Sequence, residues 1–277
     1  MGEVQAVTAS ERTATRSASP ENLPMSNLPQ PKIVVDHVSK QFWTKESEAP
    51  VLALSNITLD IQPNEFVAIV GRSGCGTTTL LNLIAGLLRP SQGQILIDGR
   101  PVDGPGPDRG MVFQQSALFP WLTAIGNIEF GPQSMGMAKA KRRALARELI
   151  ELVRLTGFED KFPHELSGGM QQRVAIARAL AMDPDILLMD EPFGALDELT
   201  RAEMQEELLR IWEARKKTVV FVTHSIVEAL YLSDRVVVLS PHPGRLRQQV
   251  AVALPRPRQR SSREFMEYYE SIHHAIF

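Results

Sequence analysis

The sequence contains only one cysteine and no long run of apolar residues. With Cys75 alone, the chain cannot form an internal disulfide. Its most apolar stretch, from Thr218 to Ser240, is interrupted by charged and polar side chains and falls short of the roughly 20 apolar residues of a membrane-spanning helix. The N-terminus also lacks the apolar run of a secretory signal. These absences predict a chain that does not cross a membrane alone and that works in a reducing cytoplasm.

Excess charge of either sign is also absent. The 30 lysines and arginines nearly balance the 32 aspartates and glutamates, which leaves a net charge of −2 and no long-range attraction to nucleic acid or anionic lipid. Two local clusters of basic residues remain. Residues 139–147 spread their charges around a predicted helix, and the arginines from Arg256 to Arg263 lie in a proline-rich connection. We interpret both clusters as solvated surface, so no nucleic-acid partner is expected.

The rest of the composition is that of a folded domain. With 277 residues, 43% of them hydrophobic, the chain can bury one large core with a subdomain. Residues 1–31 are rich in Ser, Thr, Pro, Ala and Asn and are predicted to form a disordered tail. We expect one domain over residues 32–254 and a peripheral helix within residues 255–277, after a break rich in proline and arginine.

Alternation of apolar strands with helices predicts the fold class. Short β-rich runs precede a glycine-rich turn, and later strands at residues 186–189, 218–222 and 235–239 alternate with helical segments. This pattern is typical of an α/β fold with a mainly parallel sheet covered by helices. Helical periodicity from Ala124 to Leu155 interrupts the strands, which predicts a helical subdomain inserted at about residues 115–167.

The glycine-rich turn, between a predicted strand and a predicted helix, is the first candidate site. Successive backbone N–H groups in such a turn converge on phosphate oxygens, and the helix N-terminus adds its dipole. A hydroxyl at Thr78 can also serve as a ligand of Mg²⁺. The candidate phosphate-binding residues are Gly71, Arg72, Ser73, Gly74, Cys75, Gly76, Thr77, Thr78 and Thr79.

One position of this turn departs from the phosphate-binding pattern. The lysine that normally follows the last glycine and reaches the β- and γ-phosphates is Thr77 in this sequence. Threonine can donate one hydrogen bond but cannot neutralise a phosphate. Taken alone, the turn is explained at least as well by a plain connection between strand and helix, so other motifs must decide.

An apolar strand that ends in two carboxylates supports a nucleotide site. The strand at residues 186–189 leads into Asp190 and Glu191, at the strand end where α/β sheets place ligands. Asp190 is predicted to hold Mg²⁺ through water, and Glu191 to polarise an attacking water. A solvated acidic turn is the alternative, but the glycine-rich turn about 120 residues upstream favours the nucleotide site.

The string Leu-Ser-Gly-Gly-Met-Gln at residues 166–171 is the most specific motif. Ser167, Gly168 and Gly169 lie at a predicted helix N-terminus and can bind an anion through backbone N–H groups and a hydroxyl. Ser167 is also a good N-cap, but capping does not require the whole string. The string is the signature motif of the ATP-binding cassette (ABC) family, which the sequence resembles from about residue 33 to residue 246.

This resemblance implies a P-loop fold of the ABC ATPase type, with an N-terminal antiparallel β subdomain, and ATP and Mg²⁺ as cofactors. In the family, two subunits face each other head to tail, and each ATP lies between the P-loop of one and the signature motif of the other. The remaining landmarks follow from their order along the chain. They are a Q-loop glutamine that also contacts Mg²⁺, a signature glutamine, a D-loop aspartate, a switch histidine and an adenine-stacking aromatic: Gln114, Gln171, Asp197, His224 and Phe42, with Trp43 as the alternative for the last.

The resemblance also implies membrane transport, with Glu191, His224 and Gln114 as catalytic residues. Segments 118–123 and 191–201 are similar to those of importers of nitrate, sulfonates and taurine, as is the segment Pro-Gly-Arg after residue 242. Such a subunit acts at the cytoplasmic face of the cell membrane. Its partners are a second ATP-binding subunit, two membrane-spanning permease subunits and, indirectly, an extracytoplasmic solute-binding protein. A soluble ABC ATPase is the alternative, but its coiled-coil insertions or tandem cassettes have no room here.

The missing lysine predicts weak MgATP binding and slow or absent hydrolysis at this subunit's own site. Two explanations stay open. In the first, the chain pairs with a lysine-bearing subunit, and residues 167–169 of this chain complete the site of that partner. In the second, Thr77 is an engineered or sporadic substitution. A nucleotide-sensing subunit without turnover is a third interpretation.

Overall fold

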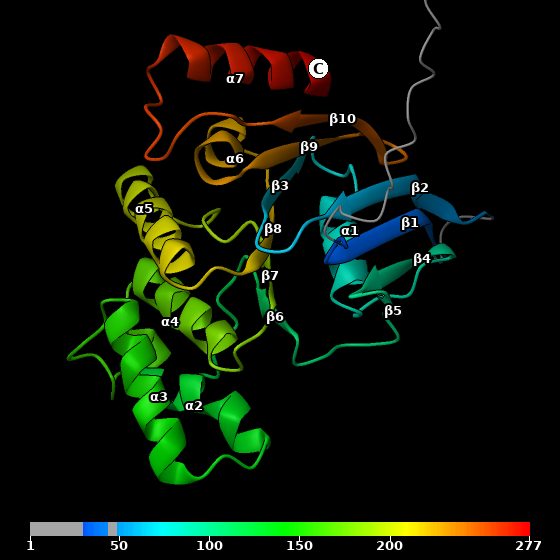
Figure 1. Ribbon diagram of the computed structural model, residues 1–277. Helices are drawn as coiled ribbons and strands as arrows, with labels where there is room; N and C mark the ends of the chain where they lie inside the picture. The colour runs from blue at the N-terminus through cyan, green and yellow to red at the C-terminus, as the bar shows by residue number, and fades with distance from the viewer. Residues whose placement is uncertain (1–29, 44–48) are drawn as a thin grey trace, which may run out of the picture.

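The computed structural model describes residues 30–43 and 49–277. The tail expected at residues 1–31 lies outside this part of the chain, except for Gln30 and Pro31. Two sheets and the helices around them make up the described residues (Figure 1). The strands are β1 (Ile33–Phe42), β2 (Val51–Ile61), β3 (Phe66–Gly71), β4 (Gln92–Ile97), β5 (Arg100–Pro101), β6 (Arg109–Val112), β7 (Ile186–Asp190), β8 (Thr218–Thr223), β9 (Arg235–Ser240) and β10 (Arg245–Ala251). The helices are α1 (Thr77–Ile84), α2 (Ala124–Ser134), α3 (Lys139–Leu152), η2 (Pro163–Glu165), α4 (Gly168–Leu180), α5 (Glu198–Ala214), α6 (Ile226–Leu232) and α7 (Arg263–Ile276).

The larger sheet has the strand order β10-β9-β3-β8-β7-β6, and all its neighbours are parallel except β10 and β9. Its central strands β3 and β8 are buried along their whole length. Because side chains alternate across a strand, Phe66, Ala68 and Val70 pack toward α2 to α7, while Val67 and Ile69 pack toward α1 and the smaller sheet. The mainly parallel sheet covered by helices is therefore confirmed.

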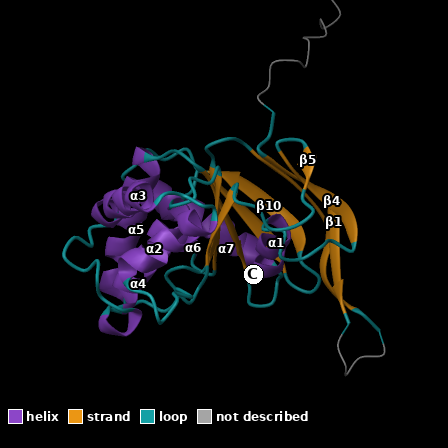
Figure 2. Cartoon of the chain, turned by 90° about the horizontal axis from the view of Figure 1, so that it is seen from below, coloured by secondary structure: helices purple, strands orange, loops and turns teal. Residues whose placement is uncertain are grey.

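The smaller sheet has the order β2-β1-β4-β5 and is antiparallel throughout. Its inward side chains, among them Ile33, Val35 and Leu59, share a core with α1. Figure 2 shows the strands of this sheet on one side of the molecule and the helices α2 to α5 on the other. This confirms the antiparallel N-terminal subdomain expected of the family.

The expected helical insert consists of two helices rather than one continuous stretch. In α2, the Thr123 side chain caps the first turn by accepting from the Gly126 N–H. Pro132 lies in the last turn of α2, and α3 begins after Ala138. Helices α2, α3 and α4 pack together through buried residues such as Ile128. Helix α2 ends because Gly136 adopts a left-handed conformation with φ of 77°, which interrupts a helical pattern that periodicity alone would continue.

Two differences from the expected elements have local causes. Helical periodicity after the glycine-rich turn predicts a helix from Thr78 to Leu88, but the helix ends at Ile84, because Gly86 adopts a left-handed conformation with φ of 77°. Strand β10 was not expected, since its sequence is dominated by polar residues such as Gln248 and Gln249. It pairs with β9 at the edge of the sheet, where polar side chains are common.

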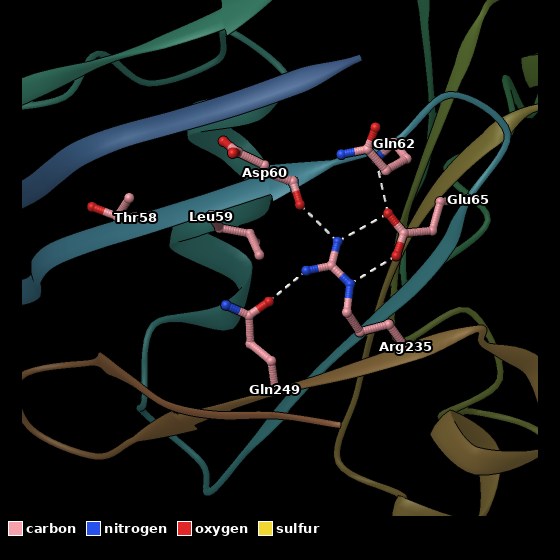
Figure 3. Close-up of a pocket in the computed structure, with 7 residues that line it drawn as sticks. All are labelled: Thr58, Leu59, Asp60, Gln62, Glu65, Arg235 and Gln249. Carbon is pink, nitrogen blue, oxygen red and sulfur yellow. Dashed lines mark hydrogen bonds and ion pairs between the residues drawn. The ribbon is translucent and has the colours of Figure 1, made fainter. Parts of the chain in front are cut away.

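One arginine joins the two sheets (Figure 3). Arg235, at the start of β9, makes a two-pronged ion pair with Glu65 at 2.7 and 2.9 Å. It also donates to the backbone carbonyl of Asp60 in β2, at 2.6 Å, and to the Gln249 side chain in β10. Such fork-shaped contacts fix both partners in distance and direction. Arg235 therefore fixes β2 of the smaller sheet against β9 and β10 of the larger one.

Two arginines of the C-terminal connection, Arg256 and Arg258, are not solvated surface, so that interpretation was wrong for them, whereas Arg260 and Arg263 are exposed as expected. Arg258 is 6% exposed and donates to four backbone carbonyls, those of Leu230, Ser233, Val252 and Leu254. Burial lowers its pKa to about 10, so the side chain stays charged at neutral pH. Charged donors of this kind satisfy carbonyls that a loop leaves unpaired. On α3, Lys139, Lys141 and Arg147 are exposed as expected, whereas Arg142 and Arg143 are half-buried.

Candidate functional site

The glycine-rich turn lies between β3 and α1. Gly74 and Gly76 have φ angles of 79° and 91°, in the left-handed region that favours glycine, and α1 begins immediately afterwards. Strand β3 is central in the larger sheet, so the turn lies at the carboxyl end of that sheet beside the ends of β8 and β9. This is the usual position of a phosphate loop in an α/β fold.

Thr77 does not extend from the turn as a lysine would. Its side chain is 5% exposed, and its hydroxyl lies 4.0 Å from the Sγ of Cys75, which is itself fully buried. Burial raises the pKa of the Cys75 thiol. The Thr77 hydroxyl thus faces the protein interior, away from the surface where a phosphate would bind.

Thr78 and Asp190 come together although they are far apart in the sequence. The Thr78 hydroxyl donates to Asp190 Oδ1 at 3.0 Å. Burial raises the pKa of Asp190, and the hydrogen bond from Thr78 opposes that effect. The described residues contain no group of three or more His, Cys, Asp or Glu side chains that could hold a metal ion. One hydroxyl and one carboxylate do fit Mg²⁺, which takes few protein oxygens and completes its shell with phosphates and water.

Glu191 is the centre of the second cluster. Its Oε1 lies 2.5 Å from His224 Nε2, and its Oε2 accepts from the Gln114 side-chain amide at 3.5 Å. His224 Nδ1 lies 3.1 Å from the Gly71 carbonyl, which can only accept, so Nδ1 carries a proton. Glu191 also has a φ of 42°, a left-handed conformation that costs a non-glycine residue about 1 kcal/mol or more. Such strain is common at functional sites.

The signature residues lie on the other side of the larger sheet from α1 (Figure 1). Ser167 is the N-cap of α4, and its hydroxyl oxygen accepts from the Met170 N–H at 3.3 Å. Ser167 and Gly169 line a pocket with Thr200 and charged residues of α4 and α5. Gln171 instead contacts the protein, since its amide donates to the Pro163 carbonyl at 2.9 Å and accepts from Ser116 at 3.1 Å.

Asp197 and Phe42 also have local contacts. Asp197 is the N-cap of α5, and hydrogen bonds from the N–H and hydroxyl of Thr200 hold its pKa below the usual value. Phe42 is half-buried at the end of β1, with Lys40 Nζ 5.1 Å from the centre of its ring, while Trp43 is 77% exposed. Neither residue is joined to the turn by a contact in the described residues.

The structure therefore gathers part of the expected site. Gln114, Glu191 and His224 form one cluster, Thr78 and Asp190 form another, and both border the glycine-rich turn. The signature residues lie apart from them. Sequence reasoning did not single out Glu228 or Arg201, which lie directly behind this cluster. A glutamate within the apolar α6 was the available signal.

Comparison with known proteins identifies the family. The sequence model of the ABC transporter family matches residues 54–194. The taurine import ATP-binding protein of Rhizobium johnstonii is 54% identical over 212 residues, which cover 76% of this chain and 80% of that protein. The nitrate import ATP-binding protein of Synechococcus elongatus is 50% identical over 244 residues, 86% of this chain and 37% of that protein.

A solved structure has the same fold. It is the dimeric, post-hydrolysis form of an ATP-binding cassette bound to ADP and Pi, with a TM-score of 0.70 and 35% sequence identity. The match covers 80% of this chain and all of that one. No helix among the described residues combines the length and apolar character needed to cross a bilayer. By sequence and fold, the chain belongs to the ABC transporter family, as one of its ATP-binding subunits and an ATP hydrolase of the translocase class.

Proposed function

We propose that this chain is the ATP-binding subunit of an importer for a small anionic solute such as nitrate, a sulfonate or taurine. The observation that carries the proposal is the high identity to subunits named for taurine import and nitrate import. Both solutes are small and present a compact group of negatively charged oxygens. In this proposal the subunit lies at the cytoplasmic face of the cell membrane. Residues 32–254 are its ATPase domain, which includes the helical subdomain at about residues 115–167. Residues 255–277 contain a peripheral C-terminal helix.

The chemistry proposed for the site is hydrolysis of ATP. Backbone N–H groups of the glycine-rich turn bind phosphate oxygens, and Phe42 stacks on adenine. Mg²⁺ would be held by Thr78, Asp190 and Gln114, and when bound it neutralises negative charge on the phosphates. Glu191 accepts a proton from the attacking water, and His224 and Gln114 hold that carboxylate in place.

Two copies of the site are proposed to form between two subunits. Ser167, Gly168 and Gly169 present a helix N-terminus that suits an anion, but they lie across the sheet from the turn that binds phosphate in the same chain. A second subunit, arranged head to tail, brings its own signature residues to that turn. The dimeric form of the solved relative supports this arrangement.

An apolar cleft beside Gln114 is the proposed contact for a permease subunit. It lies between the end of β6 and the helices of the insert, and it is lined by Met111, Phe113, Ala117, Phe119, Phe130 and Met182 together with smaller and polar residues. Phe113 is 39% exposed and Phe130 43% exposed. Exposed aromatic side chains around a cleft are typical of a protein interaction site. Its position next to the Glu191 cluster would let a partner sense the nucleotide.

Thr77 favours a second candidate, a subunit with reduced turnover that works beside a competent one. Its buried hydroxyl offers no charge to a phosphate, whereas residues 167–169 are intact and can complete the site of a partner. In such a pair the two sites would contribute unequally to the cycle.

Reconstitution of the whole transporter tests both candidates. The chain is co-expressed with its permease and solute-binding proteins, and uptake of labelled taurine, nitrate and an alkanesulfonate is measured with and without ATP. We expect ATP-dependent uptake of at least one solute. Uptake that does not depend on ATP would contradict the importer proposal, and so would the absence of uptake of all three solutes. Co-purification of a second ATPase subunit would select the paired form.

A further inference from the structure

A buried carboxylate lies behind the proposed catalytic cluster. Glu228, in α6, is 6% exposed. Its Oε2 accepts from the Thr223 hydroxyl at 2.5 Å, and its Oε1 accepts from the Gln205 side-chain amide at 3.2 Å. Arg201 Nε lies 3.7 Å from the same Oε1. Because side chains from three segments contact this one carboxylate, Glu228 connects those segments to one another.

The first segment carries the switch histidine. Thr223 immediately precedes His224, and its hydroxyl oxygen also accepts from the Ser225 N–H at 3.1 Å. The hydroxyl therefore joins the residues on both sides of His224 to Glu228. His224 in turn contacts Glu191 and the Gly71 carbonyl, so a shift of Thr223 moves the imidazole relative to both.

The second segment leads into Asp197. Arg201, in α5, donates to the Phe193 carbonyl at 3.4 Å and to the Leu196 carbonyl at 2.7 Å. These carbonyls belong to the loop between Glu191 and Asp197. The same arginine also pairs with Glu228, so one carboxylate contacts both the arginine that holds this loop and the threonine that precedes the switch histidine.

The third segment is the C-terminal connection. Arg260 Nη2 donates to Gln205 Oε1 at 2.6 Å, and its guanidinium lies 4.4 Å from the centre of the Tyr231 ring. Gln205 is 2% exposed, so its amide has no solvent alternative to these partners. Because the Gln205 oxygen accepts from Arg260, the NH₂ group of the same buried amide must point toward Glu228. Arg260 therefore orients the amide that donates to Glu228.

We propose that Glu228 is a positioning residue for ATP hydrolysis, and that the C-terminal connection acts on His224 and on the loop before Asp197 through Arg260, Gln205 and Glu228. The inference rests on the proposed function, since it assigns a role in that reaction. Removal of Arg260 frees the Gln205 amide to rotate, which loosens the contact to Glu228 and then the orientation of His224. The nucleotide-binding turn itself is not part of this chain of contacts.

The first test observes His224 without requiring activity. Imidazole nitrogen signals of the full chain, which has six histidines, are recorded by NMR and assigned with an H224N variant. We expect R260A and E228Q to shift the His224 signals, and R260K to restore them. The matched control is R263A, because Arg263 is 88% exposed and pairs only with Glu267 in the described residues. His224 signals in R260A that equal those in R263A would overturn the proposal.

The second test measures kinetics in the T77K background of the full chain. We expect E228Q to lower kcat about tenfold or more with KM for ATP within about twofold, and R260A to lower kcat less. R260K should recover most of the loss, whereas R263A should match the parent. An unchanged kcat, or a loss confined to KM, contradicts the proposal. If the T77K parent shows no ATPase activity, the proposed function fails, and the NMR test still decides the positioning role.

Discussion

Thr77 shows how much a single side chain can change in a site that is otherwise complete. The residues that would polarise water and hold Mg²⁺ are gathered around the turn, yet the position that normally supplies a positive charge holds a buried hydroxyl. A charge-assisted contact to phosphate is worth about 1.5 to 3 kcal/mol. Its loss weakens binding in the ground state and removes charge from the transition state as well.

Replacing Thr77 by lysine should therefore strengthen nucleotide binding. We expect T77K to raise the affinity for MgATP on the order of ten- to hundredfold, measured by isothermal titration calorimetry. T77S is the matched control, because it keeps a hydroxyl and adds no charge, and it should bind like the parent chain. Equal affinities for T77K and T77S would show that the charge is not what the site lacks.

Cys75 is buried under the same turn, which predicts a slow reaction with alkylating reagents. Because burial raises the pKa of the thiol, little thiolate forms near pH 8, and the sulfur is also out of reach. We expect iodoacetamide to modify Cys75 far more slowly in the native chain than in urea, as followed by mass spectrometry. Rapid modification of the folded chain would contradict the burial.

At the scale of elements, the C-terminal helix is held by arginines rather than by apolar contacts alone. Phe265 and Ile272 of α7 are buried against the core. Before α7, Arg256 pairs with Asp234 at 2.6 Å and lies over the Trp212 ring, while Arg258 satisfies four carbonyls. The connection between β10 and α7 is thus fixed by directional bonds.

Loss of Arg258 should be costly. We expect R258M to lower the free energy of unfolding by about 3 kcal/mol, because it leaves buried carbonyls without donors. Urea denaturation measures the change. R263M, in the same segment but at an exposed arginine, should cost much less. Equal effects of the two substitutions would mean that the carbonyl contacts add no stability.

The buried carboxyl group of Glu228, in α6, should make the free energy of unfolding depend on pH. Burial raises the pKa of Glu228 above 4.5, so the folded chain holds this proton more tightly than the unfolded chain does. Stability from this group is then present below pH 4.5 and is lost as the pH rises through the folded pKa. We expect the free energy of unfolding of the parent chain to fall, relative to that of E228Q, as the pH rises above 4.5. A difference that stays constant over this range in urea titrations would contradict the shift.

Strong apolar patterns in the sequence allowed prediction of most strands and helices. Contacts between side chains from separate segments could not be predicted from it. The strands around β3 and β8 were predictable because they are continuously apolar, and the ends of β7 and β8 follow from their positions in a parallel sheet. Edge strand β10 escaped prediction because its polar residues give no apolar signal. Arg258 escaped because its role depends on four carbonyls from separate segments, which no local pattern reveals.

At the scale of the whole molecule, the proposed site is divided between two surfaces. The phosphate-binding turn and the Glu191 cluster lie at one end of the larger sheet, and Ser167 caps a helix on its far side. In the proposed function, a second subunit brings the two kinds of surface together. Order along the sequence predicted both surfaces, and the resemblance to the family implied that they meet only between two subunits; the structure shows them apart in one chain.

ATP should therefore cause association when hydrolysis is blocked. We expect the T77K/E191Q double variant to form dimers in MgATP, seen by light scattering after gel filtration, because the nucleotide bridges two chains and is not consumed. Adding S167R, which places a bulky cation at the signature surface, should return the protein to monomers. Dimers that persist with S167R, or that form without ATP, would argue against the shared site.

Arg235 fixes the distance between two parts of that site. The sheet that carries Phe42 and the sheet that carries the phosphate-binding turn are joined by its bonds to Asp60 and Glu65. In the proposed site, an adenine ring on one sheet and a phosphate on the other would lie a set distance apart, and Arg235 contributes to that distance although it would contact neither. A nucleotide of matching length would contact both sheets at once, whereas pyrophosphate would contact only one and should compete poorly with it.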